Sequence, residues 1–439
     1  MIPKIDSPLT RRTLTSLALA AVAAGIAYGS GHWQALASSS WSPAHLMGGT
    51  PSAALTLAPD AGPAVKRAPV DALAGSPESR LIAIYRLIAA NEPDAALQAA
   101  EALTRSHPNF RLAQLVQADL LSARTTPLQK FGAAAAAAEG KAANDLSVLR
   151  DEARLRLAAI KERQKPGWLP SEIVLLPGSI KHVLAVDASR SRLYLFQNGP
   201  DGLSLVEDFY VSVGKQGVDK FVEGDQKTPL GVYFTTDRLD PRSLEDRFGS
   251  GALPLNYPNA YDKVRGRTGS GILLHGVTAS TYSRPPLDSD GCVAMANEDL
   301  LRLSNMLPQR DTPIIITKKL TWVPPGEQQA NKAASNFMPW VQRWQKARTM
   351  ADQNALQALY TETGGPADGA AELRFKQRVA SPPAGFADLS VLTWHDDKEM
   401  MVVTFKELAG PAQKRDRVMR QYWSRSGDEW KIAAEGPVR

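Results

Sequence analysis

The spacing of apolar residues changes along the chain, and each change marks a different kind of structure. Over residues 81–88 apolar side chains recur at i, i+3, i+4 and i+7, which places them on one face of a helix. An Ala-rich stretch at 94–104 and an apolar stripe at 112–120 predict two more helices. We therefore expect a helical domain over residues 77–165.

From about residue 170 the apolar residues come in short runs that are separated by turns. Segments 182–186 and 192–196 flank Asp187–Arg190 and predict a β-hairpin. Many short strands with Gly- and Pro-bearing turns indicate a mainly β domain over residues 170–322. The other expected strands are 209–211, 231–234, 272–274 and 313–316.

A linker is expected at 323–335, and a third module at 336–439. Its first helix places Phe337, Val341 and Trp344 on one face. Two hairpins follow, with turns at 395–398 and 426–428. A helix followed by long antiparallel strands resembles the nuclear-transport-factor-2-like (NTF2-like) cone fold. The fold class is thus multidomain α+β, with an N-terminal helical arm, a central mainly β domain and a C-terminal α+β cone.

The N-terminal segment has the layout of an export signal. Arg11 and Arg12 precede an uncharged run at 13–28, and Ala35–Ala37 offers a small-residue cleavage pattern. We expect residues 1–37 to be a signal peptide or, if uncleaved, an inner-membrane anchor. Residues 38–76 are rich in Ser, Ala, Pro and Gly, which is typical of a flexible linker. Both interpretations place the body of the chain in the periplasm.

Composition excludes some classes of function. The formal net charge of +6 over 439 residues is mild and the charges are mixed along the chain, so we expect no nucleic-acid partner. With one cysteine and six scattered histidines, the sequence contains no metal-site spacing and we expect no metal. The paired helices of 77–165 resemble a tetratricopeptide-like hairpin, and a spacer or a dimerisation arm remains the alternative to a peptide-binding groove.

The single cysteine, Cys292, is the candidate nucleophile. A lone thiol in an exported chain is either inert or kept free for chemistry. His275 lies seventeen residues earlier, at the end of a predicted strand, and histidine is the side chain suited to take a thiol proton near neutral pH. This pairing predicts that thiol-alkylating reagents label Cys292 faster than a free model thiol.

Small and stiff residues surround the expected pair. Gly291 allows a tight turn before the cysteine and leaves backbone N–H groups to face an oxyanion. Arg284 belongs to a Pro-containing segment that forms a wall over the site. Taken singly, a buried cysteine is usually an apolar filler and a strand-end histidine is usually surface. Taken as a pair in an exported chain, the two residues favour catalysis.

The ordered motifs resemble those of the YkuD-type L,D-transpeptidases. That family carries a His-Gly pair and a downstream Ser/Thr-x-Gly-Cys, here His275–Gly276 and Ser289–Val293. The segments Val211–Lys215, Gly224–Tyr233 and Tyr257–Asp262 agree in order. The resemblance covers about residues 180–318.

The resemblance implies a bacterial cell-wall enzyme that uses no cofactor. Cys292 would attack the L-centre carbonyl of the diamino acid in a peptidoglycan stem tetrapeptide, releasing D-alanine and leaving a thioester. His275 would be the general base and acid. Ser289, Gly291 and Gly276 would shape the oxyanion and substrate loop, and Tyr257 and Arg284 would contact substrate.

The acceptor of the acyl group stays open. Many relatives have Arg or Asn two residues after the cysteine, where this chain has Ala294. The domain order resembles L,D-carboxypeptidases that set cell shape in some helical bacteria. Transpeptidation is therefore the first expectation, and hydrolysis as a carboxypeptidase or amidase the second. A noncatalytic wall-binding scaffold is the alternative from another class. Expected partners are stem peptides and a second copy through the helical arm, with membrane contact only through an uncleaved N-terminus.

Overall fold

The computed structural model describes residues 73–127, 130–135, 139–239, 241–326, 332–362, 369–395 and 397–438. The expected export segment and nearly all of the first expected linker lie outside these residues. Within the described ranges no helix has the length and apolar character needed to cross a bilayer. Contacts divide the chain into two compact units, Met1–Ala153 and Arg154–Arg439.

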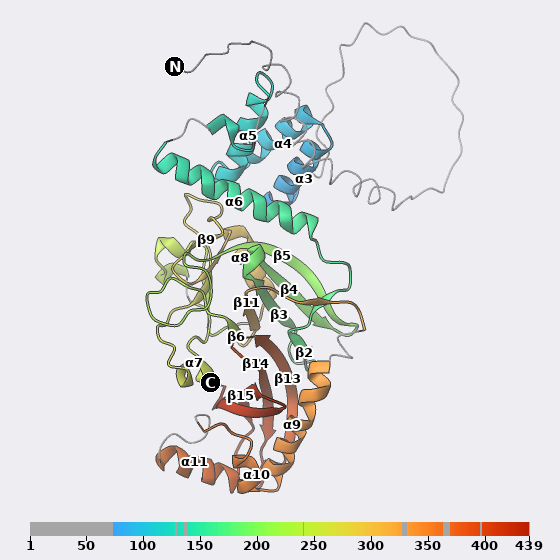
Figure 1. Ribbon diagram of the computed structural model, residues 1–439, viewed down its shortest axis with the longest axis vertical. Helices are drawn as coiled ribbons and strands as arrows, with labels where there is room; N and C mark the ends of the chain where they lie inside the picture. Colours follow the sequence, from blue (N-terminus) through green and yellow to red (C-terminus); the bar gives the residue numbers. More distant parts are fainter. Residues whose placement is uncertain are drawn as a thin grey trace, which may run out of the picture. The chain divides into compact units, whose positions relative to one another are not determined.

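The first unit is helical, which confirms the expected N-terminal helical region (Figure 1). Helix α3 (Pro77–Ala89) begins at Ser76, whose side chain accepts from the N–H of Ser79, as N-cap residues do. Helix α4 (Pro93–Ser106) buries four alanines against its neighbours, and α5 (Arg111–Ser122) buries its apolar stripe. A short 3₁₀ turn, Ala133–Ala135, follows. The long helix α6 (Lys141–Lys161) begins in this unit and ends in the second one.

The second unit contains the central curled sheet. Its strand order is β6-β11-β3-β4-β5-β10-β8-β7, with β9 paired to β5. The segments predicted from the sequence form β3, β4, part of β5, β6, β8 and β11. The strands are β3 (His182–Asp187), β4 (Arg192–Gly199), β5 (Gly202–Gly214), β6 (Gly231–Phe234), β7 (Ala252–Pro254), β8 (Leu273–His275), β9 (Leu287–Ser289), β10 (Val293–Met295) and β11 (Pro313–Thr317).

Short helical elements connect these strands. Helix α7 (Ala260–Val264) begins with a reciprocal capping box between Asn259 and Asp262, which satisfies backbone donors at both positions. The Tyr257–Asp262 motif therefore builds a helix start. Helix α8 (Asn297–Met306) follows β10 directly. The 3₁₀ turns are Ala188–Arg190, Pro241–Ser243 and Asp246–Phe248.

Both faces of the central sheet are covered, and this explains the unbroken apolar run of β3. Leu184 and Val186 enter one core with residues of α8. Val183 and Ala185 point to the other face and enter a second core. Because successive side chains of a strand point to opposite faces, a strand covered on both sides is apolar throughout.

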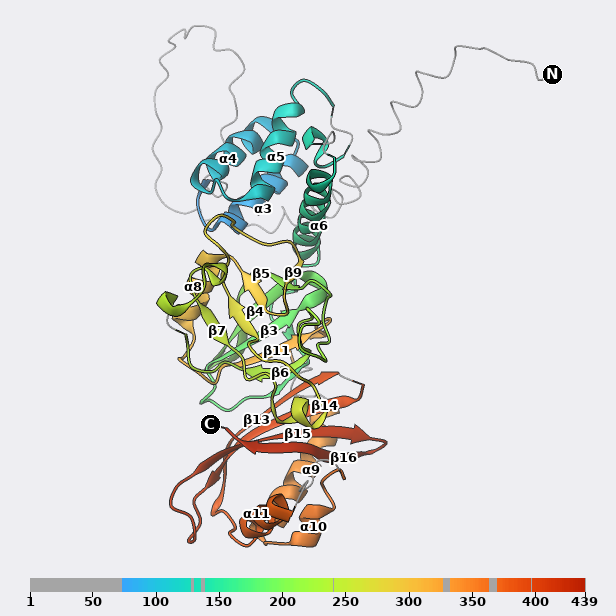
Figure 2. The ribbon, with the colours of Figure 1, turned by 90° about the vertical axis from the view of Figure 1, so that its left-hand side faces the viewer.

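A C-terminal sheet and three helices complete the unit. The strand order is β16-β15-β14-β13-β2, so β2 (Ile173–Leu175), which precedes the central sheet in sequence, lies in the C-terminal sheet. One face of this sheet forms the second core together with the central sheet. The other face packs against the helical segment (Figure 2). The elements are α9 (Lys332–Thr349), α10 (Gln353–Gln357), α11 (Gly369–Val379), β13 (Gly385–His395), β14 (Glu399–Leu408), β15 (Arg417–Ser426) and β16 (Glu429–Pro437), and β1 (Leu169–Pro170) pairs with β12 (Trp322–Val323).

The C-terminal β domain expected from the sequence is therefore present, with both hairpin turns where they were predicted. Its contact with the central domain is tight. Tyr261 of α7 lies 5.7 Å from the ring of Trp394 and 6.1 Å from the ring of Tyr422. The NTF2-like assignment of this domain stays a prediction.

Candidate active site

Strand pairing brings the two expected reactive residues to neighbouring strands. β8 and β10 run parallel, with Ala294 opposite His275 and Val293 opposite Leu274. Paired residues of a sheet point to the same face, and so do residues two apart on one strand. His275 and Ala294 therefore belong to the same face of the sheet, opposite to the face on which Leu274 and Val293 enter the core. Cys292 directly precedes β10, so the strand pairing brings its segment next to the end of β8.

The imidazole of His275 is held in one tautomer. Its side chain is buried, and Nδ1 lies 2.6 Å from the carbonyl oxygen of Gly276. A carbonyl oxygen can only accept, so Nδ1 carries the proton and Nε2 is the basic nitrogen. The ring of Phe248 packs edge-on against the imidazole at 5.1 Å and 88°. His275 is thus fixed as a neutral base.

Before substrate binds, the surroundings of His275 and Cys292 favour the neutral form of each side chain. Burial lowers the pKa of His275 to about 4, the Gly276 carbonyl partly opposes this, and Arg284 and Arg247 lower it further. Burial raises the pKa of the Cys292 thiol. Its Sγ lies 3.5 Å from the carbonyl oxygen of Gly271, and no hydrogen bond joins it to His275 among the described residues. A thiolate–imidazolium pair is therefore disfavoured before substrate binds.

This charge state differs from the expectation of a thiol activated at rest. The sequence placed a base beside a nucleophile, but burial of both groups could not be derived from their spacing. In a buried site both ionised forms lose hydration. The proton must accordingly move as the bond to the substrate forms.

The turn before Cys292 is built around Ser289. Ser289 Oγ donates to the carbonyl of Cys292 at 2.5 Å and accepts the N–H of Gly291 at 3.2 Å. Gly291 has φ +123°, and a Cβ there would lie 2.8 Å from the carbonyl oxygen of Lys227. The N–H of Gly291 is used inside the turn, so other backbone N–H groups near Cys292 would have to face an oxyanion, and that role stays a prediction.

Two residues that sequence analysis did not single out support the site. Thr228 Oγ1 accepts the N–H of Gly214 at 2.9 Å and donates to the Cys292 carbonyl at 3.4 Å. Asn297 Oδ1 accepts the N–H groups of Ser250 and Val277, at 2.9 and 3.0 Å. Thr228 could have been found from the sequence, because it belongs to the segment Gly224–Tyr233, which resembles a family motif. For Asn297 no local pattern indicated the role, because its partners lie 20 and 47 residues away.

Gly276 lies in the same network. A Cβ at this position would meet the side-chain oxygen of Asn297 and the backbone of Phe248 and Ser250. Any other residue would displace the segment that holds the His275 ring. The glycine therefore serves close packing around the base.

Two arginines surround the His275–Cys292 pair. Arg284 donates from Nη1 to the Asp288 carbonyl at 3.2 Å and from Nη2 to the Arg247 carbonyl at 3.4 Å. The guanidinium of Arg247 lies 4.8 Å from the ring centre of Phe248, the ring that contacts His275. Both arginines act on the pKa of His275 and of Cys292. At Cys292 the carboxylate of Asp290 opposes their effect.

Tyr257, the other expected substrate contact, lies inside the central core. Its side chain is 5% exposed, and its hydroxyl donates to the carbonyl of Thr268 at 3.0 Å. That bond supports the segment leading to Gly271, whose carbonyl lies against Sγ. The structure thus places Tyr257 behind this segment, whereas Arg284 lies beside the reactive pair.

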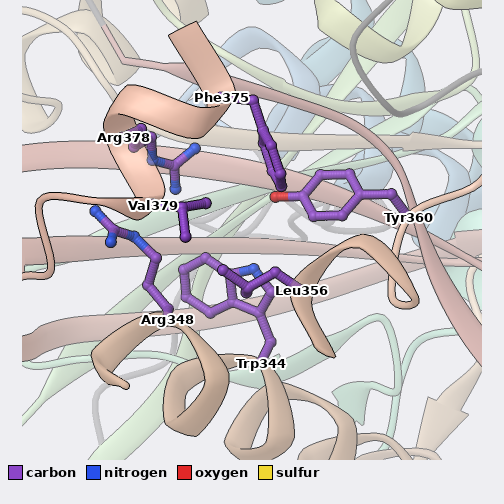
Figure 3. Close-up of a pocket in the computed structure, with 7 residues that line it drawn as sticks. All are labelled: Trp344, Arg348, Leu356, Tyr360, Phe375, Arg378 and Val379. Atoms are coloured by element: carbon purple, nitrogen blue, oxygen red, sulfur yellow. The ribbon is translucent and has the colours of Figure 1, made fainter. Parts of the chain in front are cut away.

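The C-terminal domain contains a small cavity lined by charged and apolar side chains (Figure 3). Arg348 and Arg378 both contact Glu407, at 3.0 and 3.2 Å, and Arg378 also pairs with Glu435. Aromatic and aliphatic side chains close the space around them. The cavity measures about 10 Å³, which is room for one water at most. A cavity of this size is too small for a ligand. The charges of the two arginines are balanced by those of Glu407 and Glu435.

No group of three His, Cys, Asp or Glu side chains within the described ranges is arranged to hold a metal ion.

A known family of proteins matches the central domain. Residues 181–316 match the family model of YkuD, the L,D-transpeptidase catalytic domain. The central domain of this chain therefore belongs to the YkuD-type L,D-transpeptidase family.

Two solved structures are similar to this chain. The chain is similar to Bd1075 of Bdellovibrio bacteriovorus, with 23% identity and a TM-score of 0.50 over 62% of this chain and 98% of that one. It is also similar to the helical cell shape determining protein Pgp2 from Campylobacter jejuni, with 20% identity and a TM-score of 0.48 over 64% of this chain and 97% of that one. Comparison with curated protein sequences gives no match.

The family assignment gives the class of activity. The match supports enzyme activity of the L,D-transpeptidase class in the central domain, and that family acts on peptidoglycan stem peptides.

Proposed function

We propose that this chain is a periplasmic peptidoglycan L,D-transpeptidase in which Cys292 is the nucleophile and His275 the general base and acid. The observation that carries the proposal is the pairing of β8, which ends at His275, with β10, which begins directly after Cys292. The half-buried thiol and the defined tautomer of the imidazole support the proposal, because nucleophilic catalysis requires a base near its nucleophile.

The acylation step uses both residues. Nε2 of His275 takes the thiol proton while Sγ forms a bond to the L-centre carbonyl carbon of the stem-peptide diamino acid. The bond from that carbon to the nitrogen of D-alanine then breaks, and the imidazolium returns the proton to the leaving amine. The products are free D-alanine and a thioester on Cys292.

The thioester then passes its acyl group to an amine. The amine of a second stem peptide loses a proton to Nε2 and attacks the thioester carbonyl. The C–S bond breaks and the thiolate regains the proton. The result is a cross-link between two stem peptides and a regenerated enzyme.

Recognition of the donor is assigned to the two arginines. The tetrapeptide ends in a D-alanine carboxylate, and a guanidinium is well suited to bind a carboxylate. Position 294, where many relatives carry Arg, is a buried alanine with 1% exposure here. Arg247 and Arg284, which act electrostatically on the pair, would supply the missing cation.

Hydrolysis is the second candidate, as an L,D-carboxypeptidase or amidase. The buried Ala294 favours it, because no side chain at this position can orient a second stem peptide. A thioester reacts with amine or water according to which one the site positions and which one it excludes. A noncatalytic wall-binding scaffold is the alternative of another class, and the single intact Cys–His pair argues against it.

One assay separates these candidates. Incubation of the purified protein with disaccharide tetrapeptide should release D-alanine, and Cys292→Ala should abolish the release. The mass of the second product then decides the acceptor: a cross-linked dimer means transpeptidation, and a tripeptide means hydrolysis. Absence of release by the unsubstituted protein would leave the scaffold interpretation.

The remaining parts of the proposal concern location. The sequence layout of residues 1–37 supports export, with the segment either cleaved or kept as an inner-membrane anchor. Size-exclusion chromatography with light scattering would test whether two copies associate through the helical arm.

A further inference from the structure

A buried arginine on helix α6 lies close to the loop between His275 and Cys292. The side chain of Arg156 is 1% exposed. Full burial of a guanidinium is rare, because the charge loses its hydration and must be compensated by partners. Burial lowers the pKa of Arg156 to about 10, so it stays charged at neutral pH. Such a position calls for a structural or functional reason.

Arg156 contacts the central domain through Tyr210 and Ser283. Its guanidinium carbon is 3.8 Å from the ring centre of Tyr210 on β5, a close cation–π contact. Its Nη2 donates to Ser283 Oγ at 3.1 Å. The hydroxyl of Tyr210 donates to the carbonyl of Arg284 at 3.1 Å. Arg156 and Tyr210 together therefore hold two successive residues of the loop.

That loop carries one of the two cations at the reactive pair. Arg284 connects to the backbone of Arg247 and of Asp288. The next residues are tied to the sheet, because the N–H of Val213 donates to the carbonyl of Pro286 at 2.9 Å. The position of the Arg284 guanidinium thus depends on how the chain is fastened at residues 283 and 284.

We infer that Arg156 is a positioning residue for substrate recognition: through Ser283 and the Tyr210 ring it fixes the loop that presents Arg284 to the carboxylate terminus of the donor peptide. This inference rests on the proposed function. By this inference the last turns of α6 contribute to the function of the central domain. The sequence assigned this segment to the helical domain over residues 77–165, because its contacts with Tyr210 and Ser283 are more than 50 residues away along the chain.

The test compares two donor substrates. The first is the tetrapeptide with a free terminal carboxylate, and the second is the same peptide with a C-terminal amide. For the unsubstituted protein, kcat/KM should be higher for the carboxylate. Arg156→Met keeps most of the apolar volume and removes the charge. It should lower kcat/KM for the carboxylate by about tenfold or more, the usual range for a hydrogen bond to a charged group, mainly through KM, and should change the amide much less.

Matched variants make the result specific. Tyr210→Phe keeps the ring under Arg156 and removes only the hydroxyl bound to the Arg284 carbonyl, so it should shift the same ratio in the same direction by a smaller factor. Lys161→Met changes an exposed charge at the end of the same helix and should leave the ratio unchanged. If Arg156→Met does not fold, Tyr210→Phe and Ser283→Ala carry the test.

A second readout does not depend on turnover. Amide hydrogen exchange over residues 277–288 should be faster in Arg156→Met than in the unsubstituted protein and in Lys161→Met. Unchanged exchange, or a carboxylate-to-amide ratio equal to that of the unsubstituted protein, would overturn the inference. Faster exchange in a protein that releases no D-alanine would support the fastening of the loop and refute the proposed function.

Discussion

At the scale of single residues, burial determines how the reactive pair behaves. The thiol of Cys292 has a raised pKa and the imidazole of His275 a lowered one, both chiefly because of burial. A neutral thiol is a weak nucleophile. We therefore expect general-base catalysis during the attack, in place of a thiolate formed in advance.

This gives a prediction for thiol reactivity. Because the thiol pKa is raised, the thiolate forms only above the ordinary range for cysteine. Iodoacetamide should alkylate Cys292 more slowly than free N-acetylcysteine at pH 7, and the rate should rise steadily as the pH increases. His275→Ala should abolish turnover and leave the alkylation rate at pH 7 nearly unchanged. A rate above that of the model thiol, flat from pH 5 to 8, would show a preformed ion pair.

The same residues show how far the sequence could be interpreted. Cys292 could be identified because it is the single cysteine of the chain, and His275 because it belongs to a His-Gly pair. Both signals are local in the sequence. Their protonation states could not be derived, since these depend on burial by residues from other parts of the chain. Phe248 and Arg247, which contact or act on the pair, belong to a short 3₁₀ turn that no periodicity predicted.

At the scale of elements, the tight turn between β9 and β10 holds Cys292, the proposed nucleophile. Ser289 holds both ends of this turn, and Thr228 of a distant loop holds the Cys292 carbonyl. Gly291 is the one residue whose backbone conformation requires glycine here. The turn is therefore a rigid mount for the thiol.

The substitution Gly291→Ala tests whether this turn holds the Cys292 thiol in position. The added Cβ would press on the Lys227 carbonyl at a φ of +123°, so the turn must shift. A displacement of about 1 Å at the reacting group lowers turnover by about 100-fold, and we expect that loss in the kcat for D-alanine release. Gly178→Ala is the matched control, because φ there is not in the left-handed region and no atom lies within 4 Å of the new Cβ. Equal activity of the two variants would show that the turn does not aim Cys292.

Strand positions were predictable because the apolar runs are local, and each expected strand of the central domain is present. Apart from the β3–β4 hairpin, which was predicted and is present, the pairing of these strands was not predictable. The β2 strand precedes the central sheet in sequence and joins the C-terminal sheet, and Asn297 fixes segments 20 and 47 residues away. Such long-range contacts leave no periodic trace in the sequence.

At the scale of the whole second unit, two sheets share one core. Val183 and Ala185 of the central sheet and Leu392 and Trp394 of the C-terminal sheet are members of the same buried cluster. The sequence indicated two modules joined by a linker, because hydrophobic patterning within each module says nothing about a face shared between them. The shared core makes the C-terminal domain a structural cover for the central one.

Truncation after residue 326 tests this cover. Removal of residues 327–439 would expose the second face of the central sheet and leave β2 without a partner. Each large apolar side chain returned to water costs about 1.5–3 kcal/mol, so we expect an insoluble or unfolded product. The control is Asp428→Ala, a substitution in an exposed hairpin turn. This variant should have the same unfolding temperature as the unsubstituted protein. A soluble truncated protein with full turnover would contradict the shared core.

The measurement that tests the central claim most directly is D-alanine release from disaccharide tetrapeptide by the unsubstituted protein and by Cys292→Ala, assayed side by side. The account predicts steady release by the first and none by the second, at equal thermal stability. Release by the Cys292→Ala protein at the same rate would contradict the assignment of Cys292 as the nucleophile.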